Sequence, residues 1–345
     1  MSGVQHRRVG TDEAEQRLDR WLKRHFPVLT QGAVERMCRK GELRVDGARA
    51  KASTRVAPGQ EVRIPPLPAA PAGEGTASAA ARAPDAGLVA ELRDRVLYRD
   101  DALLVIDKPA GLSVQGGTGQ TRHLDGALAG LRFGREDAPR LVHRLDLETS
   151  GVLVLGRTGA AATALTRAFR TRAVEKRYLA VVAGQPKPLA GTIRYALVKA
   201  GGRGVEKMAT LHPDAIEATP GAQAARTDYR VLETAGGRAS AVLARPVTGR
   251  KHQIRAHLAA LGTPVAGDGR YGGRGQENAG DGWGASLGQG VSRKLHLHAA
   301  ALALAHPATG RRLVLAAPLP EHMRRTWSMF GWDDPDPWAA FEPEG

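Results

Sequence analysis

A stretch rich in proline, alanine and glycine divides the chain into two parts. Residues 65 to 90 read PPLPAAPAGEGTASAAARAPDAGLVA and contain almost no large apolar side chains. Such a segment cannot build a hydrophobic core, so it is predicted to be a partly extended linker. The full length of 345 residues also suits two domains better than one. We therefore predict a small unit over residues 13 to 64, a large unit over residues 91 to 332 and a C-terminal tail over residues 333 to 345.

The charge of the chain favours a polyanionic partner. Lys and Arg number 50 against 35 Asp and Glu, which gives a formal net charge of +15. Residues 16 to 64 alone hold 12 basic and 5 acidic residues, a difference of +7. This concentration predicts nucleic-acid binding, with an ordinary solvated helix surface as the alternative. Aromatic residues make up only 4 %, which disfavours a platform for stacking bases.

The sequence lacks the features of membrane and secreted proteins. No run reaches the ~18 apolar residues that a membrane span needs, and MSGVQHRRVG at the N-terminus has no apolar core of a secretory signal. Cys38 is the single cysteine, which excludes an internal disulfide and a multi-cysteine zinc site. We predict a cytoplasmic protein with no membrane partner.

The small unit is predicted to contain two helices and a small sheet. In RLDRWLKRHF the apolar residues recur at helical spacing, and Pro27 ends that helix. Thr30 can cap a second helix, TQGAVERMCRKG, which stops at Gly41. The alternating segment ELRVDGARA turns at Asp46-Gly47, a hairpin signal.

This unit resembles the S4 RNA-binding module across nearly its whole length. The resemblance lies in RLDRWL, in the helix that enters KGELRVDG, and in PGQEVRIP. It implies two packed helices and a small sheet that bind structured RNA through the second helix and the following strand. The basic residues that match this surface are Arg36, Arg39, Lys40, Arg44 and Lys51.

The large unit alternates apolar runs with turn residues, which predicts many strands and few helices. Segments such as RYLAVVAG, TDYRVLE and SAVLARPVTG are predicted strands, and AATALTRAFRTR and KHQIRAHLAALG are predicted helices. This pattern indicates an α+β fold with a largely antiparallel mixed β-sheet and flanking helices. Residues 273 to 293 are rich in glycine and are predicted to form a surface loop.

Asp146 in LVHRLDLETSG, residues 141 to 151, is the strongest candidate for a reactive group. An aspartate at the end of a strand most often forms a turn or caps a helix. Here Thr149-Ser150-Gly151 give a tight turn that would hold it in place, and the chain is basic. A carboxylate facing a polyanion is useless for binding, so it is better explained as a reactant. Neighbouring arginines would favour its ionised form.

The segment HRLDxxTSG, residues 143 to 151, resembles the signature of the RluA family of pseudouridine synthases. Three further segments match family motifs in order: DKPAGLSV (107 to 114), VEKRYLAVVAG (174 to 184) and TGRKHQIRAHLAALGTPVAGDGRYG (248 to 272). Together with the S4 module, the combination is most similar to the RluC-type branch, which acts on large-subunit (23S) ribosomal RNA. The expected partner is that RNA, free or in an assembling subunit, and the expected oligomeric state is a monomer.

The family reaction isomerises a uridine within RNA. The N1–C1′ bond breaks, the base turns, and C5 joins C1′. No atom is gained or lost, so the resemblance implies an isomerase without a cofactor or metal. The target base must leave its helix or loop, at an unstacking cost of a few kcal/mol.

The resemblance assigns roles to four residues. Asp146 stands in the place of the essential aspartate, which attacks the sugar, attacks the base or assists proton removal at the ribose. Arg144 stands where an arginine fills the gap left by the flipped uridine; its alternative is a phosphate contact or a structural ion pair. Tyr178 aligns with the tyrosine that lies against the target base, with a core tyrosine as the alternative. Arg255 matches the basic residue that pairs with the aspartate, with a phosphate contact as the alternative.

Other motif residues are expected to have structural roles. Lys108 and Gly111 are expected to shape the fold and the cleft. His143, His252 and His257 have no carboxylate or cysteine at ligand spacing, so they are interpreted as hydrogen-bonding or RNA-facing residues.

Two other functions remain open to test. The chain could be a non-catalytic RNA-binding protein, although such a protein would not need Asp146. It could also be a base-excising nucleosidase, which generally needs a second carboxylate as acid. The motifs offer Asp107, Asp125 and Asp268 for that role. Isomerisation leaves the mass of the RNA unchanged, whereas excision releases uracil.

Overall fold

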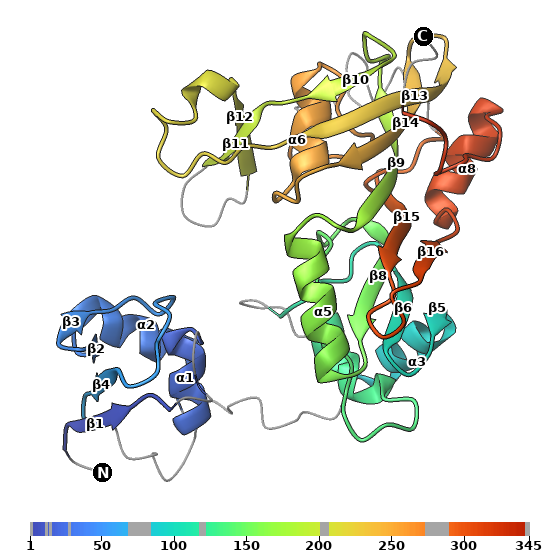
Figure 1. Cartoon of the computed structure of the whole chain (residues 1–345). Coiled ribbons are helices and arrows are strands. Elements are labelled where there is room, and N and C mark those ends of the chain that lie inside the picture. The colour runs from blue at the N-terminus through green and yellow to red at the C-terminus, as the bar shows by residue number, and fades with distance from the viewer. Residues whose placement is uncertain are drawn as a thin grey trace. The chain divides into compact units, whose positions relative to one another are not determined.

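The computed structural model describes residues 3–10, 13, 16–26, 29–67, 84–116, 122–200, 207–272 and 290–341. The chain divides into two compact units, Met1–Arg82 and Ala83–Gly345 (Figure 1). Most of the predicted linker and most of the predicted glycine-rich loop lie outside the described residues.

The small unit contains two helices and a four-stranded sheet, which confirms the predicted S4-like architecture. Its elements are β1 (Gln5–Arg8), α1 (Leu18–His25), α2 (Gln31–Lys40), β2 (Arg44–Val45), β3 (Ala48–Arg49) and β4 (Glu61–Ile64). The Thr30 side chain accepts a hydrogen bond from the Ala33 N–H at 3.2 Å, and Gly41 ends α2 with a φ of 72°. Asp46 and Gly47 both have positive φ in the two-residue turn between β2 and β3, as the sequence predicts.

Strand β1 shows that this unit begins before residue 13, where the sequence placed its start. The strand pairs antiparallel with β4, from Gln5 opposite Ile64 to Arg8 opposite Glu61. Its segment QHRR has no apolar alternation because the strand lies at the edge of the sheet and is mostly exposed. Main-chain pairing holds it there, together with polar contacts of His6 with Glu61 and of Arg7 with His25, both at 2.8 Å. No apolar pattern in the sequence indicates such a strand.

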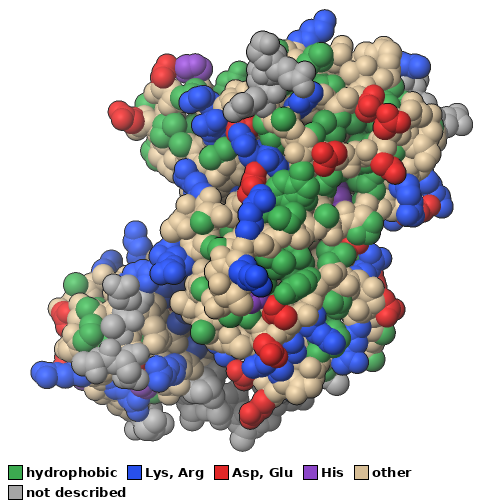
Figure 2. Space-filling view, turned by 45° about the vertical axis from the view of Figure 1, so that its right-hand side comes forward, with side chains coloured by type: hydrophobic (Ala, Val, Ile, Leu, Met, Phe, Trp, Pro, Cys, Tyr) green, Lys and Arg blue, Asp and Glu red, His purple; other side chains and the backbone are tan. Residues whose placement is uncertain are grey.

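The basic residues predicted to bind RNA stay at the surface of the small unit. Its core is closed by the apolar face of α1, where Leu18, Trp21 and Leu22 are fully buried. The exposed basic residues are Arg36, Arg39, Lys40, Arg44 and Lys51. Figure 2 shows Lys and Arg side chains scattered over the molecular surface.

The large unit is built on one extended sheet. Its strands are β5 (Val96–Arg99), β6 (Leu103–Lys108), β7 (Arg140–Leu141), β8 (Ser150–Gly156), β9 (Glu175–Ala183), β10 (Ala190–Ile193), β13 (Thr227–Ala235), β14 (Ala239–Pro246), β15 (Leu297–Ala305) and β16 (Arg312–Ala316). A separate hairpin pairs β11 (Ala196–Ala200) with β12 (Lys207–Leu211). The helices are α3 (Ala86–Asp94), α4 (Leu124–Ala127), α5 (Gly159–Arg170), α6 (Gln253–Ala260) and α8 (Glu321–Phe330), with 3₁₀ turns η2 (Leu128–Leu131) and η3 (Pro213–Ala215).

The strand order is β10-β13-β14-β9-β15-β8-β6-β5, with β16 beside β15 and β7 beside β8. Every pairing in this sheet is antiparallel except that of β15 with β8. The predicted α+β class with a largely antiparallel mixed sheet is therefore confirmed. Because β15 lies between β8 and β9, it joins the two halves of the sheet.

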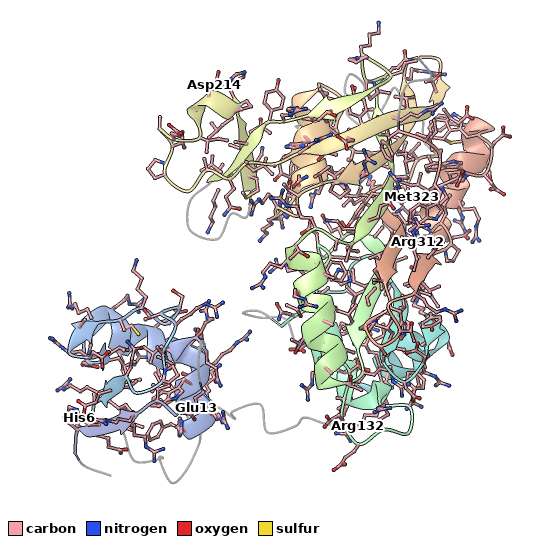
Figure 3. The ribbon with its side chains drawn as sticks, in the orientation of Figure 1. His6, Glu13, Arg132, Asp214, Arg312 and Met323 are labelled. Carbon is pink, nitrogen blue, oxygen red and sulfur yellow. The ribbon has the colours of Figure 1, made fainter. Side chains whose placement is uncertain are left out.

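Helices cover both faces of each half of the sheet. Successive side chains of a strand point to opposite faces, so Leu104 of β6 packs with α3 and α4, whereas Leu103 packs with α5. In the other half, α6 packs on one face through Leu258, and α8 packs on the other through Met323 (Figure 3) and Trp327.

The large unit extends beyond both of its predicted boundaries. Helix α3 begins inside the predicted linker, where the Asp85 side chain accepts a hydrogen bond from the Leu88 N–H at 3.0 Å. Leu88 and Leu92 of this helix are buried, so the unit starts before residue 91. At the other end, the predicted tail packs on the sheet: Phe341 joins a core cluster, and the Ala340 carbonyl accepts a hydrogen bond from Arg230 at 3.0 Å.

No helix within the described parts of the chain is long and apolar enough to cross a membrane.

Candidate active site

Asp146 lies in a tight turn between β7 and β8. The Thr149 N–H donates a hydrogen bond to the Asp146 carbonyl at 3.2 Å, which closes the turn. Gly151 follows with a φ of 110°, and a Cβ atom there would lie 2.2 Å from the Ala299 carbonyl oxygen on β15. The glycine of this motif is therefore required by backbone conformation and by the close approach of β15.

Lys108 and Gly111 hold the other side of this turn. The Leu147 carbonyl accepts hydrogen bonds from the Gly111 N–H at 2.9 Å and from Lys108 Nζ at 3.2 Å. The fully buried ammonium also donates to the carbonyls of Pro109 and Leu112, both at 2.9 Å. Burial lowers the pKa of Lys108 to about 7, although the charge of Asp146 opposes this shift. These bonds support the expectation that Lys108 and Gly111 shape the cleft.

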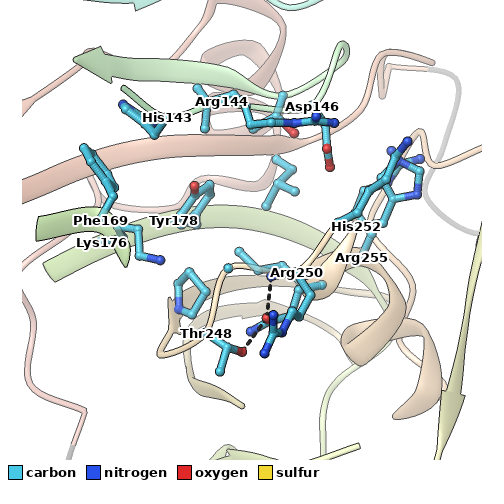
Figure 4. Close-up of a pocket in the computed structure, with 18 residues that line it drawn as sticks. His143, Arg144, Asp146, Phe169, Lys176, Tyr178, Thr248, Arg250, His252 and Arg255 are labelled. Atoms are coloured by element: carbon cyan, nitrogen blue, oxygen red, sulfur yellow. Dashed lines mark hydrogen bonds between the residues drawn. The ribbon is translucent and has the colours of Figure 1, made fainter. Parts of the chain in front are cut away.

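The four predicted site residues come together at one cavity of about 480 Å³ (Figure 4). Asp146 and Arg144 reach it from the β7–β8 turn, Tyr178 from β9 and Arg255 from α6. A second cavity of about 320 Å³ shares Arg144, Asp146 and Arg255 with the first. Asp146 is half-buried where the two cavities meet, and Arg144 is exposed.

Tyr178 is a neutral phenol close to the Asp146 carboxylate. Its burial raises its pKa above the usual value, and the charge of Asp146 raises it further. Tyr178 packs against core residues on both sides of the sheet junction, so its ring is fixed in place.

The hydrogen-bonded partner of Arg255 differs from the prediction. Its Nε and Nη2 donate to the Asp268 carboxylate at 2.7 and 2.6 Å, rather than to Asp146. Arg255 is 2 % exposed and Asp268 is fully buried. Burial lowers the pKa of Arg255, but the bonds to Asp268 and the charges of Glu148 and Asp146 outweigh it and raise that pKa. Arg255 therefore acts on Asp146 through its charge, while Asp268 fixes its position.

Lys176 is a cavity residue that sequence reasoning missed. It lies two residues before Tyr178 on β9, so the alternation of a strand places both side chains on one face. This spacing was visible in VEKRYLAVVAG, where only the tyrosine was assigned a role. Burial lowers the pKa of Lys176 to about 8, and the charge of Arg172 lowers it further.

The three histidines of the motifs are held by hydrogen bonds. His143 accepts a hydrogen bond from the Val154 N–H at 2.9 Å, and its ring stacks on Phe169 at 4.1 Å between centroids. Burial lowers its pKa to about 3, so it stays neutral. His257 contacts Thr227 Oγ1 and the Tyr195 carbonyl, both at 2.9 Å.

His252 has a positive φ of 54° at the start of α6, and its Nδ1 lies 3.0 Å from the Tyr271 hydroxyl. These contacts support the hydrogen-bonding interpretation. Within the described ranges, no group of three or more histidine, cysteine or acidic residues could hold a metal ion.

Comparisons with known proteins agree with this geometry. A family model described as RNA pseudouridylate synthase matches residues 102–260, and an S4 domain model matches residues 16–62. The chain is 36 % identical over 319 residues to ribosomal large subunit pseudouridine synthase C of Escherichia coli strain K12, covering 92 % of this chain and 93 % of that protein. The protein of the same name from Vibrio vulnificus is 34 % identical, again covering 92 % of this chain and 93 % of that protein.

Solved structures show the same likeness. The structure of human RNA pseudouridylate synthase domain containing 4 superposes with a TM-score of 0.59 at 31 % identity, covering 72 % of this chain and 98 % of that chain. Human RNA pseudouridylate synthase domain containing 1 follows with a TM-score of 0.51 at 27 % identity, covering 70 % and 96 %.

Proposed function

The chain belongs to the RNA pseudouridylate synthase family, whose members are isomerases, and from this premise we propose that it converts uridines of large-subunit (23S) ribosomal RNA to pseudouridine through Asp146. The RNA target rests on the relatives, which are named ribosomal large subunit pseudouridine synthase C. The reaction transfers no atom or electron to a second molecule, so it requires no cofactor.

The state of the Asp146 carboxylate is the observation that carries this proposal. Among the described residues, none forms a hydrogen bond or ion pair with that carboxylate. Structural carboxylates of the same unit are saturated: Asp268 is bound by Arg255, and Asp228 is bound by Thr192, Arg226 and Arg245. A carboxylate left open at the junction of two cavities is available to react.

The surrounding residues suit the steps of the isomerisation. A uridine flipped into the larger cavity would lie with its base against Tyr178 and its C1′ near Asp146. The exposed guanidinium of Arg144 can enter the space that the base leaves in the RNA. The positive charge of Arg255 attracts the Asp146 carboxylate electrostatically.

The geometry does not supply the acids that the sequence offered for a nucleosidase, and the carboxylate that does line the smaller cavity, Glu148, forms an ion pair with Arg255 at 3.5 Å. The three carboxylates that sequence reasoning offered as its acid, Asp107, Asp125 and Asp268, line neither cavity. Asp268 is also bound to Arg255 through both of its carboxylate oxygens. Asp107 has a pKa raised to about 6 by burial, but it lies away from both cavities.

The S4 unit would supply affinity and target choice. Its exposed basic residues on α2, β2 and the segment after β3 are suited to phosphate contacts, which dominate the affinity of proteins for RNA. We propose that the protein acts as a monomer, without a metal, in the cytoplasm, on ribosomal RNA that is free or in an assembling subunit.

The Asp146→Asn variant tests the central claim. It keeps the shape of the side chain and removes its charge, so pseudouridine formation should be abolished while RNA binding stays within several-fold. The measurement is carbodiimide mapping of ribosomal RNA from cells with wild-type, variant or no protein. Asp214→Asn, which changes an exposed carboxylate of η3, is the matched control and should retain activity.

Full activity of Asp146→Asn would contradict the proposal. Release of free uracil, with a matching loss of RNA mass, would instead indicate a nucleosidase. Tight binding of ribosomal RNA without any conversion by the wild type would indicate a non-catalytic RNA-binding protein.

A further inference from the structure

Lys176 is a half-buried cation that has no partner among the residues that the structure describes. It lines the larger cavity, and within the parts of the chain that the structure describes no residue forms an ion pair or hydrogen bond with its ammonium. The buried cations of the site are compensated: Lys108 donates to three carbonyls and Arg255 to Asp268. An uncompensated buried charge is costly and is typical of functional sites.

The neighbours of Lys176 place its ammonium at the far end of the cavity from Asp146. The charge of Asp146 helps to raise the pKa of Tyr178, whereas the pKa of Lys176 is lowered by burial and by the charge of Arg172. The charge of Lys176 helps to lower the pKa of His143, which stacks on Phe169 at the same end of the cavity. Asp146, Tyr178 and Lys176 therefore follow one another across the cavity (Figure 4).

We propose that Lys176 binds the carbonyl oxygen of the target uracil that points away from the ribose. This inference rests on the proposed function and names what reads the base. If C1′ lies near Asp146 and the ring lies against Tyr178, the atom of uracil most distant from C1′ is O4. A lysine ammonium only donates hydrogen bonds, and O4 only accepts them.

The symmetry of uracil lets Lys176 keep this contact through the reaction. When the N1–C1′ bond breaks, its electron pair stays on uracil, and O2 and O4 share the negative charge. A half-turn about the N3–C6 axis exchanges N1 with C5 and O4 with O2. C5 then bonds C1′, the C5 proton leaves and N1 takes up a proton. Lys176 therefore faces O4 before the turn and O2 after it, and it stabilises the charged base between them without giving up a proton.

The same contact would exclude cytosine. Cytosine presents an N4 amino group where uracil has O4, so two donors would meet in a buried site. The lysine would then remain unpaired after the base has displaced water, which makes binding unfavourable.

The test combines variants of Lys176 with a change at O4. Single-turnover conversion is measured for a short RNA that carries uridine or 4-thiouridine at the target position, with digestion to nucleosides and chromatography. Sulfur is a weaker acceptor than oxygen, and any difference in intrinsic reactivity between the two bases is the same for every enzyme. Lys176→Met keeps an unbranched chain without charge, and Lys176→Arg keeps the charge.

Lys176→Met should slow conversion of uridine roughly ten- to hundredfold, the range that a hydrogen bond to a charged group supplies. Its rate ratio between uridine and 4-thiouridine should be smaller than that of the wild type by about tenfold. Lys176→Arg should recover part of the rate. Lys199→Met, an exposed lysine of β11, should keep the ratio of the wild type.

The outcomes separate this inference from the proposed function. A wild type that forms no pseudouridine contradicts the proposed function itself. A wild type that does so, beside a Lys176→Met variant with the same rates or the same ratio, overturns only the contact. A slow Lys176→Met with an unchanged ratio and a lowered melting temperature indicates a structural lysine, which also overturns it.

Discussion

The buried ion pair between Arg255 and Asp268 predicts a large loss of stability when its charge is removed from one side. Asp268→Asn keeps one acceptor oxygen for the N–H groups of Arg270 and Tyr271, but it replaces the oxygen that binds Arg255 Nε with a donor. The guanidinium, 2 % exposed, loses its buried counter-charge and, among the described residues, keeps an ion pair only with the half-exposed Glu148 at 3.5 Å. Breaking a buried pair in this way costs about 3–5 kcal/mol of unfolding free energy.

That loss converts to a shift in melting temperature. A unit of the size of Ala83–Gly345 loses about 2–4 °C per kcal/mol, so its Tm should fall by roughly 6–20 °C. Calorimetry of the full chain is the suitable assay because the two units can melt in separate transitions. Asp214→Asn is the control, since that carboxylate is 89 % exposed and lies on η3 (Figure 3).

Activity adds a second readout for the same variant. Because Arg255 lines both cavities, an Asp268→Asn protein that is still folded at the assay temperature should convert uridine more slowly than the control. If Asp268→Asn has the same melting temperature as the wild type and converts RNA at the same rate, Asp268 does not hold Arg255 in place.

Two further predictions concern the S4 unit and pH. A chain without residues 1–82 should keep the melting transition of the large unit but modify structured RNA poorly. The logarithm of its RNA affinity should depend less steeply on the logarithm of the salt concentration, by about one unit of slope per lost phosphate contact. Equal rates of the shortened and full chains over a range of salt would give the S4 unit another purpose. The value of kcat/KM should fall above about pH 8, where Lys176 loses its proton because burial lowers its pKa. Its neighbours His143 and Tyr178 stay neutral there, because burial lowers the pKa of the histidine and raises that of the tyrosine. Lys176→Arg should therefore lack this decline; the same decline in both proteins would assign it to another group.

The sequence predicted those elements whose apolar residues recur at a regular period or form a continuous run. Strand β13 alternates at Tyr229 and Val231, β14 contains a continuous apolar run from Ala241 to Ala244, and α2 has both its cap and its stop residue in the sequence. The same reasoning missed α3, which begins in an alanine-rich segment and buries only Leu88 and Leu92. It also missed β1, an exposed edge strand with no apolar face. A polar edge strand is stabilised by pairing with a distant segment, and that pairing leaves no local pattern.

The motifs predicted that Asp146, Arg144, Tyr178 and Arg255 belong to one site, but they did not identify what each side chain contacts. Arg255 has Asp146 and Asp268 within the same region of the fold, and nothing in the spacing of HQIR selects between them. The choice follows from the loop after α6, where the N–H groups of Arg270 and Tyr271 fix the Asp268 carboxylate opposite Arg255. Such a choice depends on the direction of main-chain groups, which residue identity alone does not give.

Three cations of the site, two buried and one half-buried, show why charge in a sequence does not reveal function. Lys108 is satisfied by main-chain carbonyls, which every residue carries and no motif records. Arg255 is satisfied by a carboxylate thirteen residues away. Lys176 differs in that no described residue forms an ion pair or hydrogen bond with its ammonium. This can be recognised only when the positions of all its neighbours are known. Its lowered pKa means that the protonated lysine weakens the folded state below about pH 8, and this penalty is relieved as the pH rises toward the ordinary pKa of lysine. A folded chain keeps such a charge where a ligand completes it, and in this cavity the oxygen of a flipped uracil is the group that can.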